Sequence, residues 1–198
     1  MRHRRRGRTL GRSPSHQRAM LRNLASALVL TERDADLDDN KPKVKGRIIT
    51  TLEKAKEVRP LVEKCVTIAR NTIPQQEAAG EFATTAGRNS AEWRTWRKSD
   101  RWRKWSQAMS PVVAARRRVL ELLGDKQAVR VLFETVAPRF VDRNGGYTRV
   151  LRLAKPRLGD AGTRAVLEFV GVRDRVAQRA QAPRFESGSD EKKTSSTS

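Results

Sequence analysis

The chain has 198 residues, and its 43 Lys and Arg outnumber its 22 Asp and Glu to give a formal net charge of +21. An excess of this size repels itself in the compact state and favours an acidic partner, with nucleic acid as the first candidate. The hydrophobic content of 37% is enough for one modest core and not for two. One cysteine and two histidines exclude an internal disulfide and a Cys/His zinc set.

A membrane partner is not expected. No apolar run approaches the length that crosses a bilayer, and the basic N-terminal region lacks the bulky apolar face of a helix that lies on a membrane surface. The stretch LASALVL is too short and begins too late for a secretion signal. Because the single cysteine, Cys65, can form no internal disulfide and lies packed on the apolar side of an expected helix, the sequence fits a reducing cytoplasm.

The N-terminal region is strongly basic. Residues 2–22 hold eight arginines and no acid. We expect residues 1–14 to be a basic RNA-binding arm, disordered alone, because no apolar period occurs up to Gly11. From Ser15 to about Thr31, apolar residues recur at intervals of three and four, which predicts a helix.

A polar loop, a strand and a helix follow. Residues 32–45 lack the Gly and Glu of a calcium loop, so we expect a solvated insertion before the short strand GRIIT. Thr50 and Glu53 have the spacing of a capping box, which predicts a helix whose apolar face runs from Leu52 to Ala69. Pro60 inside this helix predicts a kink or a restart.

Residues 74–109 have the composition of an insertion and contain all four tryptophans in AEWRTWRKSDRWRKW. One helix would place the first two and the last two on opposite sides, so we expect two short helical segments that break near Ser99. Packing against the protein's own core, stacking on RNA and contact with another protein all stay open. The candidate accessory contact residues are Trp93, Arg94, Trp96, Arg97, Trp102, Arg103 and Trp105.

Helix signals and a hairpin complete the chain. Ser110 as a cap, Pro111 in the first turn and Gly124 at the end mark one helix, and Asp125 caps the next. YTRVLRLA and TRAVLEFVG are expected to form an antiparallel hairpin. In its last strand Ala165, Leu167 and Phe169 should face the core, with Arg164 and Glu168 outward. We expect one globular domain over residues 15–172, then an extension and disordered tail over 173–198.

The stretch RNGGYTRVL at 143–151 joins the last helix to the hairpin. It matches neither the GxxxxGK[ST] phosphate loop nor the GxGxxG dinucleotide fingerprint. Asn and Gly accept positive φ at low cost, so we interpret Gly145 and Gly146 as a turn.

Three blocks of the sequence carry a resemblance to a known family: MRHRRRGRTLGRSPSHQRAMLRNLASALV, IITTLEKAKEVRPLVE and LFETVAPRFVDRNGGYTRVLRLAKPRLGDAGTRAVLEFV. Their order and content resemble the bacterial large-subunit ribosomal protein of the seventeen family. The resemblance implies a two-layer α+β fold with one helix, a strand, three helices and a final β-hairpin. It further implies binding to large-subunit ribosomal RNA near the exit of the peptide tunnel, beside neighbouring ribosomal proteins. The loop at 32–45, the Trp-rich segment and the C-terminal tail depart from the family pattern, as lineage-specific additions.

The candidate RNA contacts come from the basic arm, the first helix and the hairpin turn. Arginine forks onto phosphate and stacks on bases, and each neutralised phosphate releases counterions. The turn is expected to present Tyr147, Thr148 and Arg149 to RNA. The full candidate set is Arg2, His3, Arg4, Arg5, Arg6, Arg8, Arg12, His16, Arg18, Arg22, Arg143, Tyr147, Thr148, Arg149 and Arg152.

Two other classes of function remain as alternatives. A nucleoid-type DNA-binding protein fits the charge, but no helix-turn-helix or basic zipper pattern is present. A nuclease or RNA-modifying enzyme needs a carboxylate cluster or a nucleophile with its base, whereas acids such as Glu53 and Glu57 are placed as helix partners of Lys and Arg. We therefore expect a structural ribosomal protein with no catalytic residues, metal, cofactor or small-molecule substrate.

Overall fold

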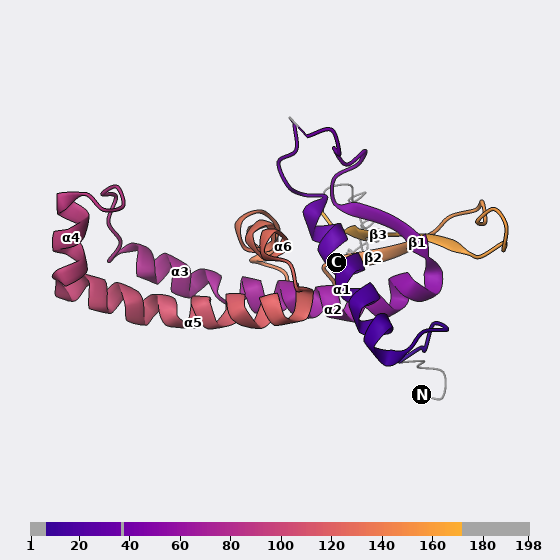
Figure 1. Ribbon diagram of the computed structural model, residues 1–198, viewed down its shortest axis with the longest axis horizontal. Coiled ribbons are helices and arrows are strands. Elements are labelled where there is room, and N and C mark those ends of the chain that lie inside the picture. Colours follow the sequence, from indigo (N-terminus) through magenta and orange to yellow (C-terminus); the bar gives the residue numbers. More distant parts are fainter. Residues whose placement is uncertain (1–6, 37, 172–198) are drawn as a thin grey trace, which may run out of the picture.

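The fold is a mixed α+β body from which a helical arm projects (Figure 1). The computed structural model describes residues 7–36 and 38–171. The elements are α1 (Pro14–Leu30), β1 (Arg47–Thr51), α2 (Leu52–Arg70), α3 (Ile73–Gly80), α4 (Ala91–Lys98), α5 (Asp100–Leu123), α6 (Lys126–Val131), β2 (Thr148–Arg152) and β3 (Arg164–Phe169). A π-helical turn (Leu132–Val136) and a 3-10 turn (Ala137–Phe140) extend α6. The expected α+β class is confirmed.

The sheet has the strand order β1-β3-β2, and both pairings are antiparallel. Leu167 of the central strand β3 lies opposite Ile48 of β1 and Val150 of β2. The predicted hairpin between β2 and β3 is therefore confirmed, and the strand predicted at GRIIT joins it. Helix α2 packs against all three strands and forms the second layer.

The faces of β3 are confirmed in part. Ala165, Leu167 and Phe169 are buried as predicted. Glu168 was expected to face outward, but only 5% of it is exposed. Its carboxylate accepts a 2.6 Å hydrogen bond from Nε of Arg149, which neutralises the charge and lets the side chain lie under cover.

Helix α2 has the predicted apolar face. Its members are all buried: Leu52, Ala55, Val58, Val62, Cys65, Val66 and Ala69. The capping box is wrong, because Thr50 pairs with Ala165 in the sheet and Thr51, the residue before the helix, makes no side-chain cap hydrogen bond. A restart at Pro60 is also wrong, since the helix continues through that residue.

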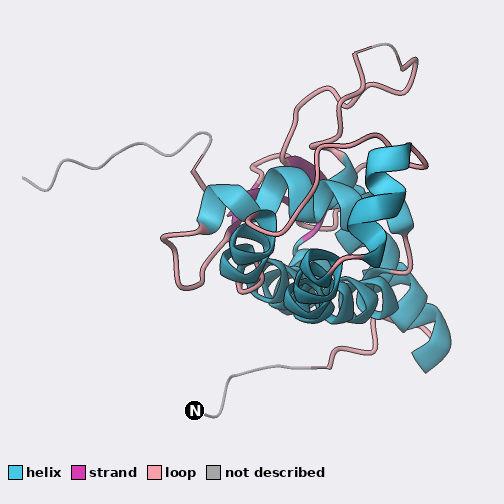
Figure 2. Cartoon of the chain, turned by 90° about the vertical axis from the view of Figure 1, so that its left-hand side faces the viewer, coloured by secondary structure: helices cyan, strands magenta, loops and turns pink. Residues whose placement is uncertain are grey.

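The arm consists of α3, α4 and most of α5. Helices α3 and α5 lie side by side, with α4 at the far end (Figure 1), and the view along the arm shows their ends together (Figure 2). The predicted break at Ser99 is confirmed. A helix start at Ser110 is wrong, because α5 runs from Asp100 through Pro111 into the body, where Val119 is buried. Its predicted end at Gly124, with φ of 76°, is confirmed.

The core forms where α1, α2, the end of α5, α6 and the sheet meet. Leu28 of α1, Val62 of α2, Val119 of α5, Leu132 after α6 and Leu167 of β3 are all fully buried there. Asp125 caps α6 as predicted, because its Oδ1 accepts hydrogen bonds from the N–H groups of Gln127 and Ala128. Among the described residues, every helix is either too short or too polar to span a bilayer.

Candidate nucleic-acid interface

The turn at 143–146 is held from beneath by α2. The guanidinium of Arg70 donates 2.6 Å hydrogen bonds to the carbonyl oxygen of Arg143 and to Oδ1 of Asn144. Gly145 and Gly146 have φ of 121° and 64°, a conformation that side chains disfavour. The interpretation of these glycines as a turn is confirmed.

The expectation that this turn presents Tyr147 and Thr148 on the surface is wrong. Each is only 1% exposed. The Tyr147 ring packs 5.1 Å from that of Phe140, and the Thr148 hydroxyl donates a 2.6 Å hydrogen bond to Glu63 on α2. A polar side chain that leaves water must be hydrogen-bonded, and this carboxylate supplies the partner. Both residues therefore stabilise the fold.

The basic side chains of the hairpin remain on the surface. Arg143 and Arg152 are exposed, whereas Arg149 is half-buried against Glu168. At the hairpin tip, which sequence analysis did not single out, Arg157 pairs with Asp160 through a 2.8 Å Nε–Oδ1 hydrogen bond. This bond holds the pKa of the Asp160 carboxyl below its ordinary value.

The basic N-terminal segment predicted over residues 1–14, which is separate from the helical arm, is described only from Gly7 onward. Arg2, His3, Arg4, Arg5 and Arg6 lie outside the described residues. Arg8 is half-buried, with Nη1 3.1 Å from Oε1 of Glu57, and its carbonyl accepts a hydrogen bond from Gln17. These contacts attach this part of the segment to α1 and α2.

Exposed polar and basic residues lie on and just before helix α1: Arg12 before it, then His16, Arg18 and Arg22, of which Arg18 and Arg22 share one face. A hollow of about 1020 Å³ separates α1 from the junction of α5 and α6, and Arg18 and Arg22 line one wall. Lys126 lines the other wall. Sequence analysis missed Lys126, whose only signal was its place next to the helix cap Asp125.

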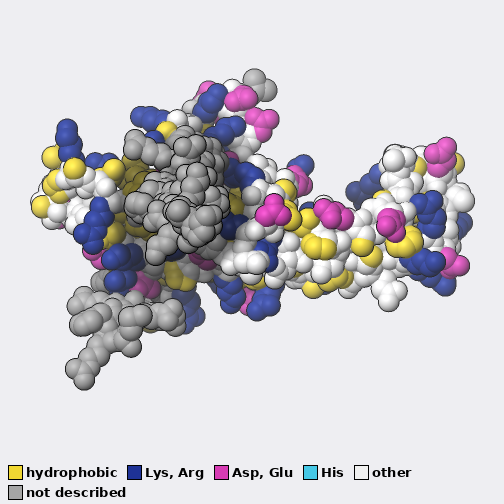
Figure 3. Space-filling view, turned by 180° about the vertical axis from the view of Figure 1, so that it is seen from behind, with side chains coloured by type: hydrophobic (Ala, Val, Ile, Leu, Met, Phe, Trp, Pro, Cys, Tyr) yellow, Lys and Arg dark blue, Asp and Glu magenta, His cyan; other side chains and the backbone are white. Residues whose placement is uncertain are grey.

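The four tryptophans gather at the end of the arm. Trp96 and Trp105 meet edge to face with ring centroids 5.6 Å apart. The guanidinium of Arg97 lies 5.1 Å from the ring centroid of Trp93 and 5.6 Å from that of Trp102. Arg94 and Arg103 are exposed beside them, and Lys and Arg side chains gather over this end of the molecule (Figure 3). The tryptophans thus share one site, although two of them lie on α4 and two on α5.

No group of three or more His, Cys, Asp or Glu side chains within residues 7–36 and 38–171 could hold a metal ion. Two of the acids in the loop at 32–45 pair with cations of the same loop. Lys41 lies 3.0 Å from Asp36, and Arg33 lies 3.3 Å from Asp38.

Comparison with known proteins gives one family. The family model of ribosomal protein L17 matches residues 20–170, which is most of the chain. The chain belongs to the ribosomal protein L17 family. The matched range runs from within α1 to just past the end of β3 and spans the arm.

Relatives in this family cover nearly the full length of the chain. It is 63% identical over 191 residues to the large ribosomal subunit protein bL17 of Rhodopirellula baltica, covering 96% of this chain and 91% of that protein. It is 34% identical over 186 residues to the protein of the same name from Nitratidesulfovibrio vulgaris, covering 92% and 99%. The corresponding protein of Lactobacillus helveticus is 35% identical over 164 residues, covering 82% and 98%.

Proposed function

We propose that this protein is a structural constituent of the large ribosomal subunit, where it binds ribosomal RNA and contacts neighbouring ribosomal proteins. The observation that carries the proposal is the match of residues 20–170 to the L17 family, with relatives named as large-subunit proteins. A structural role without catalysis follows from this family, and a place on cytoplasmic ribosomes follows from the role. The net charge of +21 suits a polyanionic partner.

The first RNA contact in this proposal is the surface of α1 and the segment before it. The side chains of Arg12, His16, Arg18 and Arg22 are exposed, and Lys126 faces Arg18 and Arg22 across the hollow. Cations on both walls can pair with the phosphates of one RNA backbone that enters between them. The proposal also assigns RNA contacts to the arginines at positions 2, 4, 5 and 6 and to His3, which lie outside the described residues.

The second contact is the hairpin surface with Arg143, Arg149 and Arg152. Arg143 and Arg152 offer exposed guanidinium groups, and Arg149 lies between them in sequence at the edge strand β2. A position near the peptide tunnel exit is part of the proposal and rests on the family resemblance alone.

Sedimentation tests the proposed assembly. Extracts of cells that make a tagged full-length chain are separated on a sucrose gradient, and the chain should migrate with the large subunit. Nuclease treatment that digests only DNA should leave this migration unchanged. A chain found mainly with the chromosome would favour the DNA-binding alternative, and a chain found mainly as free protein would contradict the proposal.

Salt dependence of RNA binding tests the α1 surface. The plot of log affinity against log salt has a negative slope, and each lost phosphate contact makes that slope shallower by about 0.9 on a duplex. The double variant Arg18→Ala/Arg22→Ala should therefore make the slope shallower by about two. The control Arg117→Ala/Arg118→Ala removes two exposed arginines of α5 and should leave the slope nearly unchanged. Equal losses in both variants would mean that total charge, and not this surface, binds the RNA.

Deleting residues 2–12 tests the basic arm. The deletion removes six arginines. If about half of these arginines contact phosphates, the slope of log affinity against log salt should become shallower by about three. An unchanged slope would contradict a role of the arm in RNA binding.

A further inference from the structure

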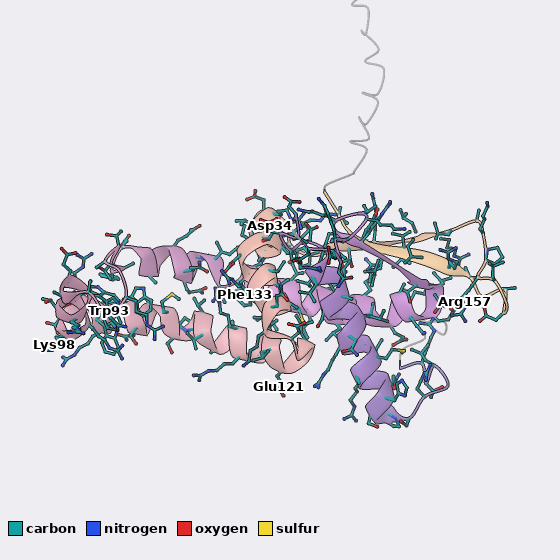
Figure 4. The ribbon with its side chains drawn as sticks, turned by 45° about the horizontal axis from the view of Figure 1, so that its top comes forward. Asp34, Trp93, Lys98, Glu121, Phe133 and Arg157 are labelled. Atoms are coloured by element: carbon teal, nitrogen blue, oxygen red, sulfur yellow. The ribbon has the colours of Figure 1, made fainter. Side chains whose placement is uncertain are left out.

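The end of the arm holds a hollow of about 520 Å³ whose walls are aromatic and basic. We call it the tryptophan hollow and define it by six of its lining residues: Arg88, Trp93, Trp96, Arg97, Trp102 and Trp105. Its volume lies within the range of small-ligand sites. Figure 4 shows Trp93 and Lys98 together at the end of the arm, well separated from Phe133 in the body.

Two of the tryptophans hold the tip together. The indole N–H of Trp96 donates a 3.0 Å hydrogen bond to the carbonyl oxygen of Phe82, and the ring meets Trp105 edge to face. Ser90 caps α4 by accepting a hydrogen bond from the N–H of Trp93. These contacts fix the loop after α3 and helix α4 on the start of α5.

The other two tryptophans form a surface. Trp93 on α4 and Trp102 on α5 both contact the guanidinium of Arg97, which itself is exposed. A guanidinium is flat and cationic and can stack on an aromatic base as well as on an indole ring. The site therefore presents three flat groups side by side, two indole rings and a guanidinium, on which a further flat group can stack.

The tryptophans do not belong to the core of the body. None of the four is a member of the buried cluster that the described residues form, or of the partly buried side chains packed against it. Each is half-buried at the tip instead. Packing against the protein's own core, one of the three interpretations that the sequence left open, is therefore wrong for the described residues, because the tryptophans contact only other parts of the tip.

The charge around the hollow is strongly positive. Seven exposed Lys and Arg surround it, at positions 88, 94, 97, 98, 101, 103 and 104. Only three acids occur between residues 81 and 105, and one of them, Asp100, pairs with Arg103 at 3.6 Å. Cations next to aromatic faces are the combination that binds the phosphates and bases of a single strand.

We propose that the tryptophan hollow binds unpaired RNA nucleotides, with a base stacked on the group formed by Trp93, Arg97 and Trp102 and the flanking phosphates on the surrounding cations. The site lies on the arm, apart from the α1 surface and the hairpin, so the protein joins two segments of RNA. The inference deepens the proposed function and rests on it for the source of the RNA.

The test is the fluorescence of the full chain, because all four of its tryptophans lie at this hollow. Titration with single-stranded oligouridylate should quench the emission to saturation. A blunt RNA duplex of equal charge should quench it at least tenfold more weakly, because paired bases cannot leave the stack. Binding elsewhere on the protein does not contribute to this signal.

Matched variants locate the site. Trp93→Ala and Arg97→Ala should each weaken the quenching affinity for the single strand by about tenfold, as the loss of one stacked partner predicts. Trp93→Phe keeps a flat ring and should restore most of the affinity. Arg117→Ala removes an equal charge from the body end of α5 and should have little effect. Far-UV circular dichroism and the emission maximum of each free variant show whether the tip keeps its fold.

Three outcomes would overturn the proposal. These are equal weakening by Arg117→Ala, equal quenching by single strand and duplex, and a response only when ribosomal proteins replace the RNA. If Trp93→Ala unfolds the tip, the double variant Arg94→Ala/Lys98→Ala replaces it in the test and should weaken the quenching affinity for the single strand. It removes two exposed cations that no described ring contact uses. The oligonucleotide is synthetic, so a negative result leaves the sedimentation test of the proposed function intact.

Discussion

The carboxylate of Glu63 on α2 holds Thr148 at the first residue of β2. Its Oε1 accepts a 2.8 Å hydrogen bond from the Thr148 backbone N–H and a 2.6 Å bond from the Thr148 hydroxyl. Oε2 accepts a third, at 3.0 Å, from the N–H of Tyr147. One side chain of the helical layer therefore fixes where the glycine turn ends and the strand begins.

Glu63→Ala should lower the free energy of unfolding by about 2–3 kcal/mol, because it leaves buried donors of Tyr147 and Thr148 without their acceptor. Urea unfolding followed by circular dichroism measures the change. The control Glu121→Ala removes an exposed carboxylate of α5 (Figure 4) and should change stability by less than about 0.5 kcal/mol. Equal stabilities of the two variants would refute the role assigned to Glu63.

Phe169→Ala should lower the free energy of unfolding by roughly 3–5 kcal/mol. The Phe169 ring is buried beside that of Phe140, at a centroid distance of 6.2 Å, so its truncation leaves a cavity. The same urea assay applies. Leu158→Ala at the hairpin tip is the control, because Leu158 is 97% exposed and its loss leaves no cavity. A cost below about 1 kcal/mol for Phe169→Ala would show that its ring contributes little to the core.

Cys65 should react with iodoacetamide only when the protein unfolds. Burial raises the pKa of its thiol to about 12, so at pH 8 the folded protein holds almost no reactive thiolate. Unfolding returns the thiol to water and to its ordinary pKa. Alkylation followed by mass spectrometry should be slow in buffer and should accelerate with urea along the unfolding curve. Rapid labelling without urea would contradict this burial.

Arg157→Ala should raise the pKa of Asp160 toward its ordinary value of 3.8, because the guanidinium hydrogen bond is the main cause of the lowered value. A carboxyl whose folded pKa is depressed contributes stability above its ordinary pKa, and that contribution is lost as the pH falls through the folded value. Carboxyl resonances followed by NMR below pH 5 measure the shift. Lys155→Ala, which removes a neighbouring cation but not the partner, should leave the titration nearly unchanged.

Sequence periodicity predicted the elements that bury one face. The apolar positions of α2 were identified correctly, and the alternation in β3 located its buried apolar residues but not the burial of Glu168. Cap signals were less informative. Asp125 does cap α6, whereas Thr50 is used by the sheet and Ser110 lies inside α5. Pro111 marks a helix start in isolation, but α5, which packs along α3, continues through it.

The part of the candidate interface that consists of exposed basic residues could be predicted from the sequence, and the part that depends on tertiary contacts could not. Arg18 and Arg22 lie on the surface as an arginine-rich segment suggests, but the pairing of Arg8 with Glu57 spans 49 residues and leaves no local signal. Tyr147 was misplaced for the same reason. Its burial depends on Phe140 and Glu63, which the fold brings together from different elements.

The strand order β1-β3-β2 has a consequence for the timing of folding during synthesis. The central strand β3 is the last of the three to be made, and until Phe169 has been added neither β1 nor β2 has its partner. The pairing of β1 with β3 also closes a loop of more than 110 residues, which places it among the slow, non-local steps. Helices α1 and α2 can form early and pack against each other, but the part of α2 that packs on β3 waits for a strand made about a hundred residues later. The sheet therefore closes only after its last strand has been made, whereas the helices that precede it can already pack against one another.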